Sequence, residues 1–134
     1  MTKQWAIACG MALLASIGLT GAAATAPTVS LTPASLWFGN QTVNTTSAAQ
    51  IATLTNGGTS PLVISSIGLS GTDAPDFSRT YTCPIGGAGL AVGASCTIRV
   101  KFRPTATGAR SADLVVNDNG ADSPRTAALS GTGE

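Results

Sequence analysis

Few side chains in this sequence have types that support catalysis. The 134 residues include no histidine, which removes the commonest general base and the commonest transition-metal ligand. The remaining acid–base candidates are carboxylates without a partner base, namely Asp73, Asp76, Asp113, Asp118 and Asp122. No phosphate-binding glycine motif is present. We therefore expect no enzyme and no cofactor, with a small secreted hydrolase as the less favoured alternative.

One segment contains oxygen-bearing side chains close together, at Asp118, Asn119 and Asp122. Such oxygens are the ligands that calcium prefers, but the distal glutamate of a helical calcium loop is missing. Gly120 and Pro124 lie in the same segment and are typical of a turn. We interpret the segment as a turn and expect no metal site.

Two cysteines are expected to form a structural disulfide. Of the three cysteines, Cys9 lies in a segment that we expect to be removed, which leaves Cys83 and Cys96. The twelve residues between these two do not fit a Cys-x-x-Cys redox motif, and two thiols alone do not make a zinc site. The enclosed residues 84–95 include four glycines and are costly to order. A cross-link around a loop of this size contributes roughly 3 kcal/mol.

The N-terminal residues resemble an export signal. Lys3 precedes an apolar run over residues 5–19, and small residues follow. Residues 1–24 are therefore expected to be a signal peptide, cleaved after Ala24 or Ala26. An uncleaved membrane anchor is the alternative, because residues 4–26 have enough length to span a bilayer. The expected product is a periplasmic or extracellular domain over residues 25–134, without stable membrane insertion.

The rest of the chain has an all-β pattern. Short runs rich in β-branched and apolar residues alternate with Gly, Pro, Asn and Asp. The predicted strands are residues 29–31 with 36–38 (one edge strand broken by Pro33), 47–56, 62–69, 76–83, 96–103, 112–117 and 125–131. In residues 62–69 the inward phase shifts near Ser65 and Ser66, which predicts a β-bulge. About seven such strands predict an immunoglobulin-like antiparallel β-sandwich.

The predicted core of this sandwich is thin. Its large members are expected to be Leu36, Phe38, Leu54, Leu62, Ile64, Phe77, Ile98, Val100, Phe102, Leu114, Val116 and Leu129. A domain of this size is marginally stable when it is rich in Gly and Ala, so the disulfide is expected to contribute to its stability.

Residues 96–103 show the clearest alternation and the first candidate for binding. Cys96, Ile98, Val100 and Phe102 are expected to face the core, so that Arg99, Lys101 and Arg103 face solvent. This cationic ladder is able to dock anionic lipid headgroups, envelope polysaccharide or an acidic protein. The alternative is a solubilising face whose charges are paired with nearby acids.

A second candidate for interaction is Trp37. It lies between two inward residues, so alternation directs its ring outward, where it can serve as an interaction hot spot or a sugar-stacking platform. The alternative is a ring that covers the sandwich edge. After residue 24, six basic and six acidic residues balance, which argues against nucleic-acid binding.

Several short motifs follow one another along the chain. They are residues 31–33 (Leu-Thr-Pro), 36–39 (Leu-Trp-Phe-Gly), 54–58 (Leu-Thr-Asn-Gly-Gly), 61–67 (Pro-Leu-Val-Ile-Ser-Ser-Ile), 93–98 (Gly-Ala-Ser-Cys-Thr-Ile), 102–104 (Phe-Arg-Pro) with Gly108, and 129–133 (Leu-Ser-Gly-Thr-Gly). These motifs resemble bacterial choice-of-anchor D domains, a family similar to the Hydin-type and major-sperm-protein-type immunoglobulin-like modules. The resemblance implies an immunoglobulin-like fold. It implies spacer or interaction modules in exported or surface-attached proteins, and it carries no catalytic residues.

These observations favour a non-catalytic exported module of the bacterial cell envelope or exterior, either binding or structural. A protein or envelope polysaccharide is the expected kind of partner. The alternative is a self-assembling fibre or surface-layer subunit, in which residues 25–33 form an extended arm that pairs with the edge of a neighbouring copy.

Overall fold

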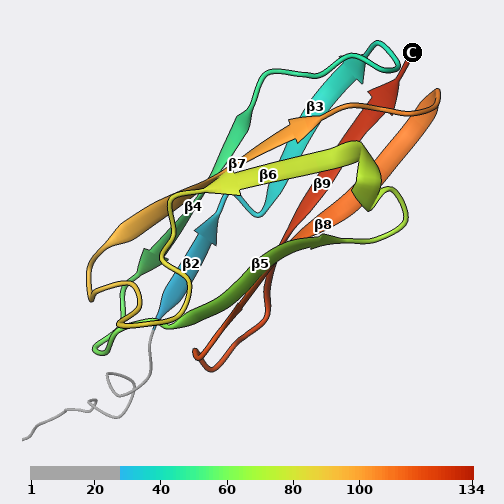
Figure 1. Cartoon of the computed structure of the whole chain (residues 1–134). Helices are drawn as coiled ribbons and strands as arrows, with labels where there is room; N and C mark the ends of the chain where they lie inside the picture. The colour runs from blue at the N-terminus through green and yellow to red at the C-terminus, as the bar shows by residue number, and fades with distance from the viewer. Residues whose placement is uncertain (1–27) are drawn as a thin grey trace, which may run out of the picture.

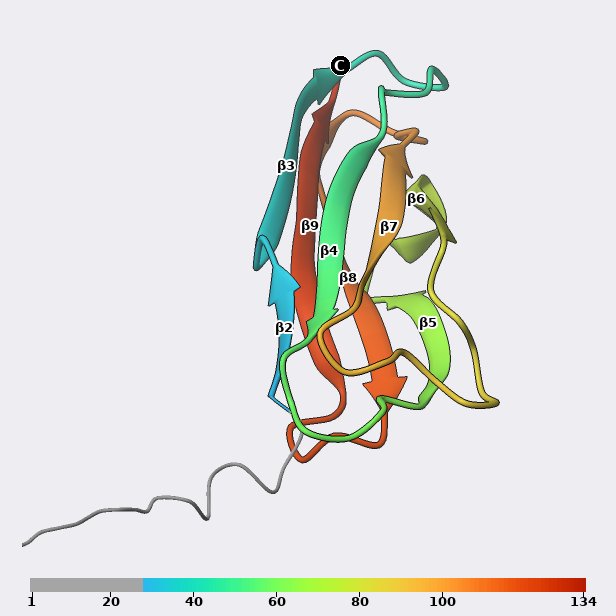
Figure 2. The same cartoon turned by 90° about the vertical axis from the view of Figure 1, so that its left-hand side faces the viewer.

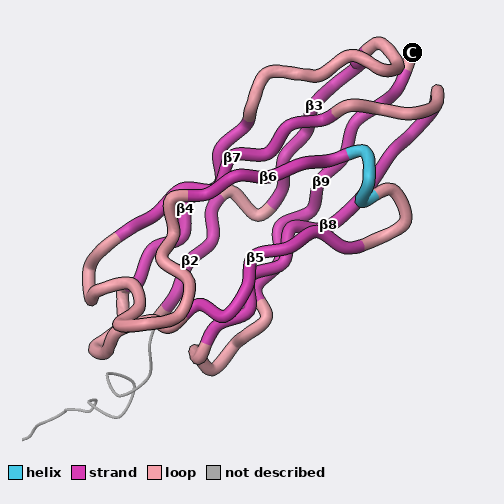
Figure 3. Tube along the Cα trace, viewed as in Figure 1, coloured by secondary structure: helices cyan, strands magenta, loops and turns pink. Residues whose placement is uncertain are grey.

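The computed structural model of the chain describes residues 28–134, so the expected signal peptide lies outside the described residues (Figure 1). The described part consists of eight strands and one short 3₁₀ helix (Figure 3). They are β2 (Val29–Thr32), β3 (Ser35–Gln41), β4 (Gln50–Asn56), β5 (Ile64–Ser70), η3 (Ala74–Asp76), β6 (Phe77–Tyr81), β7 (Ser95–Phe102), β8 (Gly108–Asp118) and β9 (Arg125–Gly133).

The strands form two four-stranded sheets that face each other (Figure 2). One sheet has the order β2-β4-β7-β6, and the other has the order β3-β9-β8-β5. Hydrophobic side chains from both sheets meet between them, as in a sandwich. The predicted immunoglobulin-like all-β sandwich is thus confirmed.

The first edge differs from the prediction. Residues 29–41 form two strands in different sheets: β2 pairs antiparallel with β4, and β3 pairs parallel with β9. The chain crosses between the sheets at Pro33 and Ala34, which belong to neither strand. Of the arm expected over residues 25–33, Val29–Thr32 is not free, because it is already paired with β4 within its own domain.

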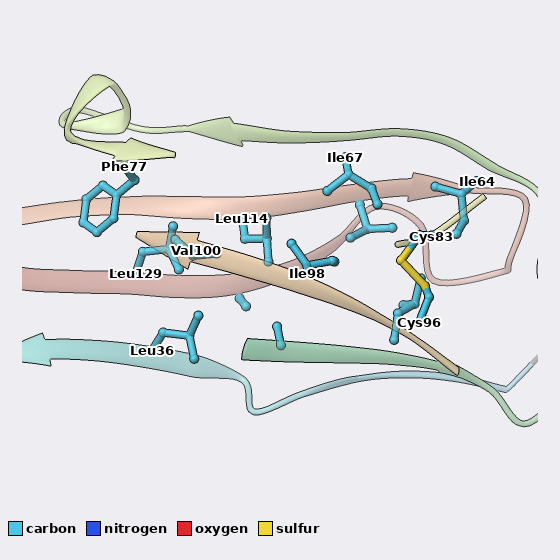
Figure 4. Packing of buried hydrophobic residues seen from close by; sticks show 14 of the residues in the cluster. Leu36, Ile64, Ile67, Phe77, Cys83, Cys96, Ile98, Val100, Leu114 and Leu129 are labelled. Atoms are coloured by element: carbon cyan, nitrogen blue, oxygen red, sulfur yellow. A yellow bond between two sulfur atoms is a disulfide. The ribbon is translucent and has the colours of Figure 1, made fainter. Parts of the chain in front are cut away.

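The core is made of the inward positions of both sheets (Figure 4). Every predicted large core residue is buried except Phe38, which is only partly buried. Its ring lies at the margin of an aromatic cluster, 5.8 Å from the ring centroids of both Phe77 and Phe102. Phe77 and Phe102 themselves stack at 4.9 Å.

The predicted bulge in β5 is confirmed. Ile64 pairs with Asp118 and Ser66 pairs with Asn117, so the register shifts between Ile64 and Ser66. A bulge changes the phase of a strand, and for this reason both Ile64 and Ile67 face the core although their positions differ by three, an odd number.

The glycine-rich loop between the cysteines closes one end of the sandwich. Leu90 exchanges two backbone hydrogen bonds with Leu62, and the Gly86 amide donates to the Ile64 carbonyl. The loop also bonds β4, because Asn56 and Ala94 are joined by a backbone hydrogen bond of 2.9 Å. The loop is thus held by backbone contacts as well as by the predicted cross-link.

Candidate interaction surfaces

Strand β7 presents a cationic face to solvent. Its burial alternates as predicted: Ile98 and Val100 are fully buried, and Arg99 and Lys101 are exposed. Arg103 follows the strand and is also exposed. The neighbouring β6 pairs antiparallel with β7 and places Ser78 opposite Lys101 and Thr80 opposite Arg99. The outer surface of β6 and β7 therefore has short hydroxyl side chains beside long cationic ones.

A shallow depression of about 430 Å³ lies on this surface. Its lining residues are Ala49, Ser78, Arg79, Thr80, Arg99 and Lys101. The lining thus has three cationic residues, two hydroxyls and no aromatic ring. Arg79 is an addition that the sequence analysis missed, since residues 76–83 gave only a weak, polar strand pattern. We refer to the surface formed by Ser78, Thr80, Arg99, Lys101 and Arg103 as the cationic face. Arg79 lies at its margin, and its side chain is directed toward β5, where Nε donates to the Ile67 carbonyl.

The cations of this face carry no ion pair in the described part of the chain. The three ion pairs found between residues 28 and 134 use only Arg110 and Arg125 as cations. The acids outside those pairs are Asp113 on the other sheet, Asp122 in the β8–β9 turn and the terminal Glu134. The alternative in which nearby acids pair with Arg99, Lys101 and Arg103 therefore has no support. Although the described residues carry equal numbers of basic and acidic side chains, this surface is positively charged.

Trp37 lies on the other sheet, away from the cationic face. It belongs to β3, is 59% exposed and pairs with Ser130 of β9. Its backbone carbonyl accepts a hydrogen bond from the Gln50 amide Nε2. On the same sheet, a depression of about 310 Å³ is lined by Ser111, Asp113 and Ser130 among others, but Trp37 is not part of that lining. The structure does not bring Trp37 together with Arg99, Lys101 and Arg103.

Two of the candidate carboxylates stabilise the fold instead of lining a site. The Asp76 carboxylate is buried and accepts hydrogen bonds from Thr105 and Arg110, and Arg110 also pairs with Asp73 at 3.1 Å. Burial by itself would raise the pKa of Asp76, but the hydrogen bonds from Arg110 and Thr105 outweigh it and hold the pKa below its ordinary value. A carboxylate kept ionised by a bound guanidinium is a poor proton donor or base.

The residues considered for calcium are also engaged. Asp118 accepts hydrogen bonds from the Gly120 amide and from Arg125, and Asn119 accepts one from the Val63 amide. These contacts close the β8–β9 turn, as the sequence pattern suggested. Within residues 28–134, no group of three or more His, Cys, Asp or Glu side chains is placed to hold a metal ion.

The predicted disulfide between Cys83 and Cys96 is present, with the two Cα atoms 5.0 Å apart. Cys96 lies in β7, and Cys83 lies two residues after the end of β6, which is the neighbour of β7 in the same sheet. The bond therefore fastens the two ends of the loop of residues 84–95 within one sheet, and it does not bridge the two sheets (Figure 4). No helix in residues 28–134 has the length and apolar character to cross a membrane.

The two facing sheets and the buried alternating core define an immunoglobulin-like domain. Residues 27–132 match the model of the HYDIN/CFA65/VesB-like immunoglobulin-like domain, and the chain belongs to this family. The sequence-based resemblance to Hydin-type modules is thereby confirmed. No curated protein sequence matches the chain.

Solved structures with the same fold come from different contexts. The ASH/PapD-like domain 7 of human CEP192 is 18% identical with a TM-score of 0.56, over 90% of this chain and 93% of that one. The secreted serine protease VesC from Vibrio cholerae is 14% identical with a TM-score of 0.56, over 81% of this chain. The VesB protease of the same organism is 18% identical with a TM-score of 0.53, over 78% of this chain. The chain spans only 23% of VesC and 31% of VesB, and at these identities the likeness concerns the fold alone.

Proposed function

We propose that the domain is a non-catalytic exported binding module of the bacterial cell envelope or exterior, of the choice-of-anchor D type, and that it docks anionic partners through the cationic face. The observation that carries this proposal is the unpaired charge. Arg79, Arg99, Lys101 and Arg103 gather on two adjacent strands without a carboxylate partner, while the other two cations of the described residues are both ion-paired. Charges left free on one surface attract partners of opposite sign.

A non-catalytic role is supported by the state of the carboxylates. Asp73, Asp76 and Asp118 are committed to ion pairs with arginines. Asp113 and Asp122 lie on different parts of the second sheet and its turn. Most glycoside hydrolases use two carboxyl groups on either side of the scissile bond, and these carboxylates do not form such a pair.

Export is supported by the N-terminal residue pattern and by the disulfide, because disulfides persist in oxidising compartments. A domain of the same family fold in the secreted protease VesC fits an extracytoplasmic role. N-terminal sequencing of the protein from the periplasm or medium of an expressing bacterium tests this part. It is expected to begin at Thr25 or Pro27, and retention of Met1 on all of the protein would contradict export by cleavage.

Co-sedimentation with washed bacterial envelope fragments tests the docking. The wild-type domain is expected to sediment at low salt and to be released at high salt, since screening weakens contacts between exposed charges. A variant with Arg99→Gln, Lys101→Gln and Arg103→Gln should bind about a hundredfold more weakly, because each basic residue near an anionic surface contributes about 1 kcal/mol. Trp37→Ser is the matched control on the opposite sheet and should bind like wild type. Equal binding by the triple variant, or binding that is insensitive to salt, would exclude docking through the cationic face.

A further inference from the structure

The edge of the sheet next to the cationic face is open. Strand β6 is the last strand of its sheet (Figure 1). After Phe77, all of its residues are exposed. In an antiparallel pair, every second residue directs its N–H and C=O toward the partner strand. The Thr82 amide donates to the Thr97 carbonyl, and the Arg103 amide donates to the Asp76 carbonyl, so the even-numbered residues of this segment face β7. The N–H and C=O groups of Arg79 and Tyr81 therefore point away from the sheet.

Strand β5, at the facing edge of the other sheet, contacts β6 through a side chain and does not pair with it as a strand. The Arg79 side chain crosses toward β5, where its Nε donates to the Ile67 carbonyl at 2.7 Å, and its guanidinium lies 5.9 Å from the centre of the Tyr81 ring. These contacts fill the inner side of β6. Within residues 28–134, β6 pairs only with β7, and no loop backbone hydrogen bond uses Arg79 or Tyr81, so their outward N–H and C=O groups are open to another extended segment.

We propose, building on the function proposed above, that the partner is an acidic, extended polypeptide segment that adds to β6 as a fifth strand. Its backbone would pair with Arg79 and Tyr81. Every second side chain would then lie beside Ser78 and Thr80 on the outer surface, above the depression. Ser78 and Thr80 are short, so acidic side chains at these positions can reach across them to Arg99 and Lys101 on β7.

Charge distinguishes this partner from a second copy of the chain. Two domains that met edge to edge at β6 would bring Arg79, Arg99 and Lys101 of both copies together, and like charges across a strand pair are destabilising. Positive charge at an edge is a common protection against self-pairing. The same charge favours a strand with acidic residues at alternate positions.

The chemistry of the surface also favours a peptide over an anionic polysaccharide. Only a polypeptide offers the alternating N–H and C=O groups that an open strand edge binds. The lining of the depression includes no aromatic ring on which a sugar could stack. A polysaccharide would use the cations and leave the Arg79 and Tyr81 backbone groups unbonded.

The test mixes the domain from Thr25 to Glu134 with an eight-residue peptide of alternating glutamate and valine. Fluorescence anisotropy measures binding of the peptide, and amide hydrogen exchange measures protection of the domain. Bound peptide is expected to slow exchange at the Arg79 and Tyr81 amides about tenfold or more, because these amides become hydrogen-bonded. The Ser78 and Thr80 amides already bond to β7 and should change little. Methylation of the peptide nitrogens that face β6 should abolish binding.

Variants of the domain separate charge from strand pairing. Arg99→Gln with Lys101→Gln should weaken peptide binding about tenfold or more, as expected for two lost charge-assisted contacts. Trp37→Ser should have no effect. A peptide with lysine in place of glutamate should not bind.

Three results would overturn the proposal. They are no binding of the acidic peptide, binding that survives nitrogen methylation, and peptide binding that leaves the exchange rates of the Arg79 and Tyr81 amides unchanged. In each case, salt-sensitive binding of the domain to envelope fragments would still support the cationic face as a docking surface, so the two proposals fail separately.

Discussion

The carboxylate of Asp76 accepts a hydrogen bond from Nε of Arg110 at 2.7 Å, and this contact joins the two sheets of the sandwich. Asp76 ends η3 directly before β6 of one sheet, whereas Arg110 belongs to β8 of the other. Thr105, in the connection between β7 and β8, donates both its hydroxyl and its amide to the same carboxylate. Asp76, which is only 2% exposed, therefore meets two groups that lie 29 and 34 residues further along the chain.

Loss of the Asp76 carboxylate should destabilise the whole domain. Asp76→Ala leaves Arg110 and the Thr105 amide without their acceptor, and removing one partner of a buried pair costs about 3 kcal/mol. Denaturant unfolding followed by tryptophan fluorescence measures the change. Asp113→Ala is the control, because Asp113 is exposed on β8 and forms no ion pair, and it should shift stability by less than about 0.5 kcal/mol. Similar losses for both variants would contradict the role of Asp76.

The same carboxylate predicts how stability changes in acid. Burial opposes ionisation, but the hydrogen bonds from Arg110 and Thr105 outweigh burial and lower the pKa of Asp76 in the folded state. The stabilisation is therefore complete above the pKa of an unfolded aspartate, about 3.9, and is lost as the pH falls through the lower folded pKa. Unfolding free energies measured from neutral pH downward should decline below about pH 4 in wild type and less steeply in Asp76→Asn. Parallel declines in the two proteins would show that another group dominates.

At the opposite end of the sandwich, Asn56 organises the turn after β4. Its side chain is fully buried, donates to the Ser60 and Leu90 carbonyls, and accepts from the Gly58 amide. Asn56→Ala should therefore cost about 2–4 kcal/mol, from unpaired buried polar groups and a small cavity. The comparison is Asn119→Ala, which removes one exposed contact to the Val63 amide and should cost about 1 kcal/mol or less. Equal losses in thermal unfolding would contradict this prediction.

Local patterns predicted the parts of the fold that depend on neighbours in sequence. The alternation of β7 and the bulge at Ser65 follow from a period of two, which short segments display by themselves. The sheets to which β2 and β3 belong do not follow from such local patterns, because the two segments have similar patterns. Their sheets are decided by pairing with strands further along the chain, β2 with β4 at Leu54 and β3 with β9 at Leu129.

The same reasoning explains what was predicted of the candidate site. The exposure of Arg99 and Lys101 followed from alternation alone. Alternation could not predict that Arg99 and Lys101 lack ion pairs. That depends on which acids are already paired with other cations, and Asp76 pairs with Arg110, 34 residues along the chain. The sequence pattern predicts Asn56 only as the last residue of a strand, because its burial arises from the loop that contains Leu90.

Gly89 is required by a close approach of two backbone segments. Its φ is +79°, and a Cβ atom there would lie 2.5 Å from the Leu62 carbonyl oxygen, which is held by its hydrogen bond from Leu90. Gly89→Ala should cost about 2–4 kcal/mol, from left-handed strain together with displacement of this backbone pair. Gly87→Ala is the matched control, since Gly87 has a φ of +59° but open space around it, and it should cost only about 1 kcal/mol. Chemical denaturation of both variants checks the difference, and a Gly89 variant no weaker than the Gly87 variant would exclude the close approach.

The disulfide should stabilise the loop that closes the end of the sandwich more than the sheets themselves. Cys83→Ala with Cys96→Ala removes a cross-link whose loss costs roughly 3 kcal/mol for a loop of this length. Because Leu90 and Gly86 are also held by backbone bonds to Leu62 and Ile64, the folded state should persist in the double variant. Hydrogen exchange should then increase first at the amides of Gly86 and Leu90, while those of β8 and β9 remain protected. Both cysteines are only 5–6% exposed, so wild type should resist mild reductant until denaturant is added. Collapse of protection throughout β8 and β9 on mild reduction would show that the bond holds the entire sandwich together.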